Sequence, residues 1–168
     1  PASPEVWKII LEEAKQAAKM GFGEINLDYI RFPSDGDLES TIYPVWDKKS
    51  SRARIITSFS RFIKEELKKE FPEVLLTADV FGYLLLRDDD LGIGQSVIEL
   101  ADIFDYICPM VYPSHYDAGN FNFANPAEHP YEVVHYSMTT AVGRLLKASS
   151  TPSKLRPWLQ DFDLGADY

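Results

Sequence analysis

Two aspartates in this 168-residue sequence sit at the ends of short apolar runs that also carry aromatic side chains. Asp28 lies in EINLDYIRFPSDG, residues 24–36, and Asp79 lies in LLTADVF, residues 75–81. A pair of carboxyl groups can cleave a glycosidic bond, because one protonates the leaving oxygen while the other attacks the sugar or activates water. A carboxylate is costly to bury without partners. The two aspartates therefore mark either a functional site or satisfied structural positions.

The alternation of side chains along a strand predicts which of them share a face with these aspartates. Four segments read as strands, at residues 24–30, 74–81, 106–112 and 156–162. In each of them a polar or aromatic group falls near the C-terminal end. The groups that share one face are Asn26 and Asp28, Thr77 and Asp79, Cys108, Met110 and Tyr112, and Trp158, Gln160 and Phe162.

Helical segments alternate with these strands. Ser3, Pro4 and Glu5 predict the start of a first helix that ends near Gly21. Apolar residues at helical spacing predict further helices at about 51–70, 95–102 and 127–147. Pro109 weakens the third strand, since proline removes a ladder donor. The order α-β-α-β-α-β-α-β predicts an α/β fold with a parallel sheet and right-handed crossovers.

The loops after the strands are long, at 33–50, 83–94 and 113–126, whereas those before the strands are short. In parallel barrels and open parallel sheets, sites form at the carboxyl ends of the strands. We therefore expect Asp28 and Asp79 to be catalytic, within a site whose aromatic rings supply flat area for sugar faces. The substrate-binding residues predicted around them are Asn26, Tyr29, Arg31, Phe81, Tyr112, His115, Trp158 and Gln160.

Composition excludes several other classes of protein. The formal net charge of −9 argues against a nucleic-acid backbone as the main partner. A single cysteine, Cys108, rules out an intrachain disulfide. No apolar run in this segment is long enough to cross a membrane. No glycine-rich phosphate loop follows a strand, and no close cluster of metal ligands exists, so we expect no cofactor and no metal.

Structural roles remain open for the same residues. Asp28 could form an ion pair with Arg31 or Arg156, and Asp79 could cap loop amides. A divalent metal held by Asp28, Asp79 and His115 is a weaker alternative. Cys108 fits a small core residue better than a nucleophile. Residues 88–90, DDD, are most simply a solvated loop, although a calcium site is conceivable.

The motifs EINLDYIRFPSDG, LLTADVFGY, DYICPMVYPSHY and RPWLQDF, in this order, resemble a glycoside hydrolase domain family of bacterial (β/α)8-barrel proteins, long classed as a domain of unknown function. The resemblance covers nearly the whole chain. It implies that the four segments are roughly strands four to seven of a TIM barrel. In related barrel glycosidases a nucleophile on strand four is paired with an acid on strand five, which implies Asp28 as nucleophile or base and Asp79 as acid. Many such enzymes use Glu as the acid, so Asp79 departs from that pattern.

The resemblance also implies that residues 1–168 form a single partial barrel, lacking the N-terminal strands and the last strand of a typical barrel of about 250 residues. We then expect a carbohydrate substrate, specifically a polysaccharide, and association with either a second copy or the missing half of the barrel. An extracellular or cell-envelope location is also implied. The second hypothesis is a carbohydrate-binding domain without catalysis, in which the carboxylates only orient sugar hydroxyls.

Overall fold

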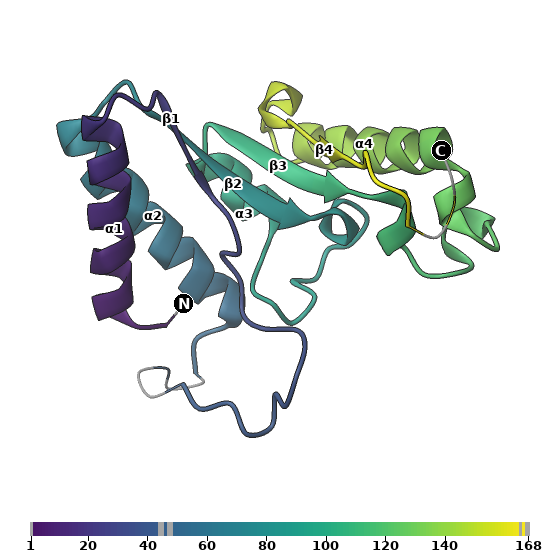
Figure 1. The fold of residues 1–168 in the computed structure, drawn as a ribbon, viewed down its shortest axis with the longest axis horizontal. Helices are drawn as coiled ribbons and strands as arrows, with labels where there is room; N and C mark the ends of the chain where they lie inside the picture. The colour runs from purple at the N-terminus through teal and green to yellow at the C-terminus, as the bar shows by residue number, and fades with distance from the viewer. Residues whose placement is uncertain (1, 44–45, 47–48, 165, 167–168) are drawn as a thin grey trace.

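Helices and strands alternate along the chain as the sequence predicts (Figure 1). The computed structural model describes residues 2–43, 46, 49–164 and 166. Short 3-10 helices occupy several of the loops, beginning with η1 at Gly82–Leu85. The main elements are α1 (Pro4–Lys19), β1 (Glu24–Leu27), α2 (Arg52–Glu70), β2 (Leu75–Phe81), α3 (Val97–Ile103), β3 (Tyr106–Val111), α4 (Pro130–Lys147) and β4 (Trp158–Leu159).

The four strands form one parallel sheet in the order β1-β2-β3-β4. Each strand pairs with the next one in the chain, so the sheet curls in one direction like part of a barrel wall (Figure 1). The predicted fold class, an α/β domain corresponding to part of a TIM-type barrel, is confirmed. The register fixes which side chains stand beside one another, for example Asn26 beside Thr77 and Asp79 beside Cys108.

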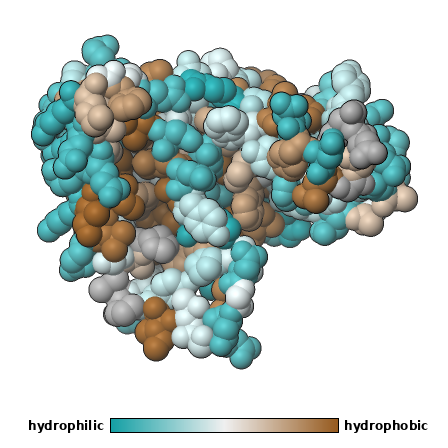
Figure 2. Space-filling model, viewed as in Figure 1, coloured by the Kyte–Doolittle hydropathy of each residue, from teal (hydrophilic) through white to brown (hydrophobic). Residues whose placement is uncertain are grey.

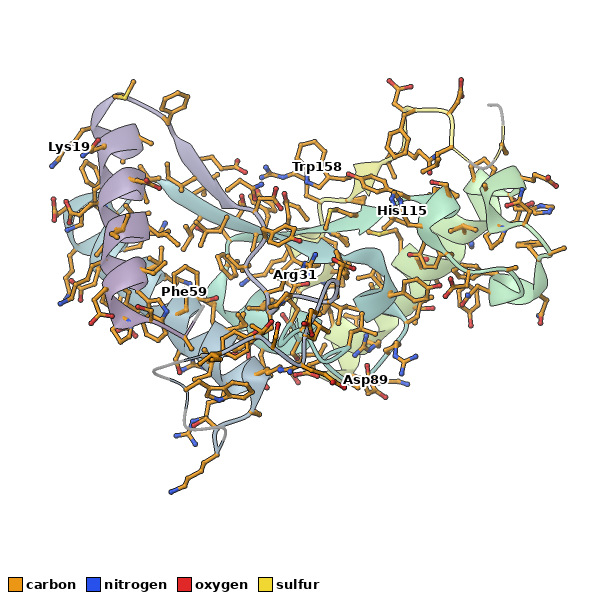
Figure 3. The ribbon with its side chains drawn as sticks, turned by 60° about the horizontal axis from the view of Figure 1, so that its bottom comes forward. Lys19, Arg31, Phe59, Asp89, His115 and Trp158 are labelled. Carbon is orange, nitrogen blue, oxygen red and sulfur yellow. The ribbon has the colours of Figure 1, made fainter. Side chains whose placement is uncertain are left out.

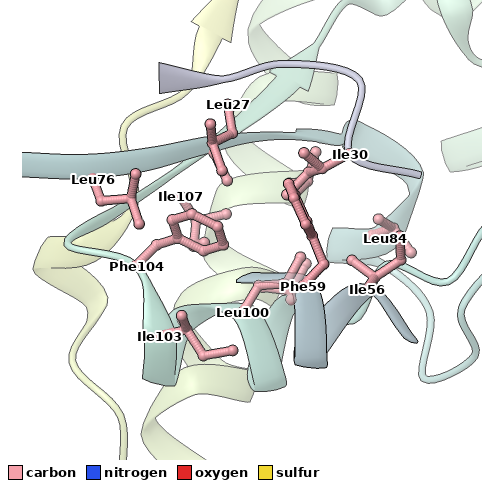
Figure 4. Close-up of a cluster of buried hydrophobic side chains, with 14 of the residues drawn as sticks. Leu27, Ile30, Ile56, Phe59, Leu76, Leu84, Leu100, Ile103, Phe104 and Ile107 are labelled. Carbon is pink, nitrogen blue, oxygen red and sulfur yellow. The ribbon is translucent and has the colours of Figure 1, made fainter. Parts of the chain in front are cut away.

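One face of the sheet packs against the helices. Leu76, Ala78 and Val80 of β2 have no exposed surface, and they join a core to which every long helix contributes. Figure 4 shows Phe59 and Ile56 of α2 beside Leu100 and other residues of this core. Ser51 caps α2 by accepting a hydrogen bond from the backbone N–H of Arg54, which satisfies a donor at the helix start.

The first predicted strand is too long by three residues. β1 ends at Leu27, and Tyr29 adopts a left-handed backbone conformation with φ of 58°. That conformation costs a non-glycine residue about 1–3 kcal/mol and is incompatible with a strand. The chain therefore leaves the sheet immediately after Asp28, well before Pro33.

The fourth predicted strand is also shorter than expected, with two residues at Trp158–Leu159 and an isolated bridge between Leu155 and Ile107. Met110 pairs with Trp158, so the preceding positions, Pro109 and Pro157, fall opposite each other. Neither proline can donate a ladder hydrogen bond. This explains the gap between the bridge and the strand.

The remaining differences are at element ends. The last long helix begins at Pro130, three residues later than predicted, after the 3-10 turn η4 (Pro126–Glu128). The predicted loop 83–94 begins with η1, which lies against β3: a Cβ added to Gly82 would come within 2.4 Å of the Met110 carbonyl oxygen. Only glycine allows this approach.

The surface mixes polar and apolar areas (Figure 2). Exposed apolar side chains include Ile9 on α1, Phe22 before β1, and Trp158 and Leu159 on β4. Within the described residues no helix is both long and apolar enough to cross a membrane.

Candidate functional site

The sheet face turned away from the helices, called the open face below, carries the polar side chains. Along β2 the residues of this face are Thr77, Asp79 and Phe81, and they alternate with the apolar residues of the core. Figure 3 shows that Arg31, His115 and Trp158, from three distant segments, lie in the middle of the molecule around the strand ends, far from Lys19 on α1.

Asp28 is the first residue after β1, one position beyond the last pair of the β1–β2 register. Leu27 pairs with Ala78, and both aspartates follow immediately. Asp28 is exposed, and its Oδ1 accepts a hydrogen bond of 2.7 Å from the backbone N–H of Tyr29. The left-handed conformation of Tyr29 thus accompanies a contact that holds the Asp28 carboxylate beside its own backbone.

Asp79 is held by a residue of the fourth strand. Its side chain is only 7% exposed, and its Oδ1 accepts a hydrogen bond of 2.8 Å from the indole Nε1 of Trp158. Among the described residues only this indole donates to the carboxylate. Asp79 therefore does not cap loop amides. Its second oxygen carries no hydrogen bond from the described protein.

The pKa of the Tyr112 phenol is raised above its ordinary value. Burial is the main cause that raises this pKa, followed by the negative charges of Asp79 and Asp28. A charge shifts a pKa in this way only when it lies close to the titrating group. Tyr112, Asp79 and Asp28 all lie at the carboxyl ends of neighbouring strands.

A cavity of about 310 Å³ opens beside Tyr112 at the carboxyl ends of the strands. Its walls are mostly aromatic, with Phe81, Tyr83, Tyr112, His115 and Tyr116 among the lining residues. Phe162 extends this group, because its ring centroid lies 5.5 Å from Tyr112 and 6.2 Å from His115. The structure thus brings the predicted residues Phe81, Tyr112 and His115 together.

Arg31 lies between two aromatic rings at the same end of the sheet. The centre of its guanidinium is 4.1 Å from the Tyr29 ring centroid and 4.6 Å from that of Phe81. Its Nη1 donates to the carbonyl oxygen of Phe32 and to Ser34 Oγ. Arg31 therefore ties the residue after Asp28 to the strand that bears Asp79 and clamps the start of the 33–50 loop. Phe32 itself is fully buried and does not line the site.

The part of the open face near the N-terminal ends of β1 and β2 holds a polar network that the sequence did not predict. Thr77 Oγ1 lies 3.0 Å from Glu24 Oε1 and 2.8 Å from Asn26 Oδ1. Arg156 pairs with Glu24 at 2.7 Å and lies 3.9 Å above the Tyr106 ring centroid. Continuing the Asn26–Asp28 alternation backwards by two residues would have placed Glu24 on this face, although not its pairing with a residue 132 positions away.

Two glutamines fix the ends of the strands. Gln95 Nε2 donates to the backbone oxygens of Ile30 and Asp79, and its Oε1 accepts from Phe81 N. No sequence signal marked this residue. Gln160, predicted to bind substrate, instead accepts from the backbone and hydroxyl of Ser114 and donates to Phe162 O. Its amide is occupied by the protein.

The structural alternatives for Asp28 were an ion pair with Arg31 or Arg156 and a place in a metal site. The described residues contain no ion pair between Asp28 and either arginine, and Arg156 is paired with Glu24. In the same part of the chain, no group of three or more His, Cys, Asp or Glu is placed to hold a metal ion.

The two remaining sequence features are explained by their contacts. Burial raises the pKa of the Cys108 thiol to about 11, which suits a packing residue and not a nucleophile. The DDD segment is bound by its surroundings, since Asp88 pairs with Arg144 and Asp89 with Arg87. Asp90 accepts a hydrogen bond from the backbone of Gly92.

Parallel strands with short loops on one side, long loops on the other, and polar side chains at their carboxyl ends define a barrel-type α/β protein. The chain belongs to the family described as "Putative glycosyl hydrolase domain", which matches residues 1–168. The family resemblance drawn from the motifs is thereby confirmed. A comparison with curated protein sequences gives no match.

Two solved structures with a similar fold come from bacilli. The spore cortex-lytic enzyme SleL of Bacillus cereus is 14% identical with a TM-score of 0.57, over 93% of this chain and 30% of SleL. The "putative sporulation-specific glycosylase ydhD" of Bacillus subtilis is 14% identical with a TM-score of 0.56, over 92% of this chain and 43% of that one. The chain thus spans less than half the length of either protein, and the likeness is one of fold.

Proposed function

We propose that this chain provides the catalytic face of a glycoside hydrolase acting on a polysaccharide, with Asp28 as nucleophile or base and Asp79 as acid. The observation that carries the proposal is the adjacency of the two aspartates at the end of paired parallel strands. The cavity beside Tyr112 has aromatic walls suited to sugar rings. Membership of the family supports the reaction class.

The different surroundings of the two aspartates support different roles. Asp28 is exposed, so a sugar or a water molecule can reach it. Asp79 is enclosed, and the Trp158 indole fixes one oxygen while the other remains available to carry a proton. In glycoside hydrolysis one carboxyl group must be protonated at the moment when the other is ionised.

The separation of the two carboxyl groups decides the stereochemical outcome. Retaining glycosidases place them roughly 5–5.5 Å apart, whereas inverting enzymes need roughly 6.5–9.5 Å to admit a water molecule. In the proposed reaction Asp79 protonates the leaving oxygen. Asp28 either attacks the anomeric carbon, so that water then hydrolyses the glycosyl-enzyme, or activates the water molecule that attacks it.

The test is an activity screen of the full-length protein on a panel of polysaccharides and oligosaccharides. Asp28→Asn and Asp79→Asn should each abolish hydrolysis without lowering the melting temperature appreciably. Asp102→Asn, a change at an exposed aspartate of α3, is the matched control and should retain full activity. Proton NMR of the first product anomer distinguishes the two roles of Asp28, because a nucleophile gives retention of configuration and a general base gives inversion.

Binding without cleavage by the wild-type protein would contradict the hydrolase proposal and favour a carbohydrate-binding domain. Undiminished turnover by Asp28→Asn would remove this residue from the mechanism.

A further inference from the structure

A second cavity, of about 540 Å³, lies between the loop that follows β3 and the first turns of α4. The loop contributes Phe121, Asn122 and Phe123, and the helix contributes Tyr131, His135 and Tyr136. None of these residues belongs to the carboxylate site described above. The rings of Phe121 and Phe123 have no role in the proposed reaction.

The helix presents aromatic side chains that its packing does not use. The buried residues of α4 are Val133, Ser137, Ala141 and Leu145, which form one stripe. Tyr131 and Tyr136 lie off this stripe and are 74% and 58% exposed. Large exposed rings that line the same cavity are typical of a binding surface.

The loop is held in a fixed shape that builds the opposite wall. Phe121 and Asn122 both adopt left-handed conformations, with φ of 57° and 64°, after Gly119 at 89°. The Phe121 ring packs edge-on against Tyr136 at a centroid distance of 5.4 Å. Phe123 stacks on His129 at 3.8 Å. These contacts order the aromatic wall before any ligand arrives.

The polar groups of the cavity indicate a neutral, hydroxyl-rich ligand. No hydrogen bond within the described residues occupies the side chains of Asn122 or Glu132, so both are free to bind. The described lining contains no lysine or arginine. A nucleic acid strand also stacks on aromatic rings, but it needs a positively charged groove. Sugars match aromatic faces combined with amide and carboxylate acceptors.

Aromatic contacts connect this cavity to the first. Tyr116 lines the cavity beside Tyr112, and its ring centroid lies 5.0 Å from that of Phe121. Tyr83, also in the first cavity, receives hydrogen bonds from Asn120 Nδ2 and from the backbone of Asp117. The two cavities therefore lie on either side of the Tyr116–Phe121 contact and are close neighbours.

We propose that the cavity between the 113–126 loop and α4 is a distal subsite that binds a neutral sugar unit of the same glycan chain whose bond is cleaved at Asp28 and Asp79. This proposal rests on the proposed function for the identity of the chain. Tyr131 and Tyr136 stack on the sugar, and Asn122 and Glu132 bind its hydroxyls. The subsite makes affinity depend on chain length.

The test uses isothermal titration of the full-length protein carrying Asp28→Asn, which prevents turnover. The probes are chito-, cello- and xylo-oligosaccharides of two and six units. We expect one hexamer to bind more tightly than its dimer. Tyr131→Ala and Tyr136→Ala should each weaken that hexamer by about 5- to 10-fold, as expected for the loss of an aromatic contact, and should leave the dimer unchanged.

Two variants complete the design. Tyr131→Phe keeps the ring and should keep the hexamer affinity. Phe22→Ala removes an exposed ring outside both cavities and should change neither ligand. The proposal is overturned if no hexamer binds more tightly than its dimer. It is also overturned if the hexamer still binds more tightly than the dimer after Tyr131→Ala and after Tyr136→Ala. A length advantage that depends on the two tyrosines, in a protein that hydrolyses nothing, would support the subsite and reject the hydrolase.

Discussion

Removing the indole N–H of Trp158 tests whether that residue fixes the orientation of Asp79. Trp158→Phe keeps a ring but deletes the donor of the 2.8 Å bond to Asp79 Oδ1. A hydrogen bond contributes about 0.5–1.5 kcal/mol to stability between neutral groups and about 1.5–3 kcal/mol when one partner is charged. Asp79 is 7% exposed but Trp158 is 49% exposed. Solvent therefore screens the bond from one side, and we expect a coupling energy of about 1–2 kcal/mol.

The assay is a double-mutant cycle of Trp158→Phe and Asp79→Ala, followed by urea unfolding monitored with far-UV circular dichroism. The matched control is Trp7→Phe combined with Asp79→Ala, because Trp7 packs on Phe59 and Phe62 on the helix side and should show no coupling. Additive effects of Trp158→Phe and Asp79→Ala, with coupling below about 0.5 kcal/mol, would refute the reasoning. In an active protein Trp158→Phe should also lower kcat, because the acid loses its fixed orientation.

Three further predictions concern packing, titration and assembly. Gly82→Ala should destabilise the protein by about 1–3 kcal/mol in thermal or urea unfolding, because the added Cβ collides with the Met110 backbone; an unchanged stability would contradict the close approach. At pH 8.5 the Cys108 thiol should react with iodoacetamide far more slowly in the native protein than in urea, since burial raises its pKa to about 11. Equal labelling rates in the native protein and in urea would refute this slow reaction. The stability that the folded protein gains from the protonated Cys108 thiol should be complete below the unfolded pKa of about 9 and be lost as the pH rises toward 11. Among the described strands β1 and β4 are paired on one side only, and such edges recruit further strands; light scattering of the isolated 168-residue segment should therefore detect association, and a stable monomer would show that the open sheet suffices.

The alternation of side chains made much of this fold predictable. The pattern of β2, with Leu76, Ala78 and Val80 inward and Thr77 and Asp79 outward, follows from period two alone, and it is what the structure has. Family membership agrees with the order of the motifs. The position of Asp28 beside Asp79 followed from parallel pairing without any knowledge of contacts.

Other features depend on interactions that no local pattern encodes. The end of β1 is set by the left-handed conformation of Tyr29, a residue type with no preference for it. The shortness of β4 results from two prolines that are distant in sequence and meet only in the sheet. The Glu24–Arg156 pair joins the first strand to the segment that precedes the last one. Each requires the tertiary arrangement to be known first.

Gln95 is synthesised after both aspartates of the proposed site. The residue bonds the backbone after β1 and both ends of the Asp79–Phe81 segment, yet it follows Ile30 by 65 residues. While the ribosome is still adding the segment between them, the strands that carry Asp28 and Asp79 can pair but cannot be fastened at their carboxyl ends. A nascent chain that stalls before residue 95 would therefore hold both aspartates without a fixed spacing. In the proposed site the spacing of the two aspartates thus depends on an amide that enters the chain after both of them.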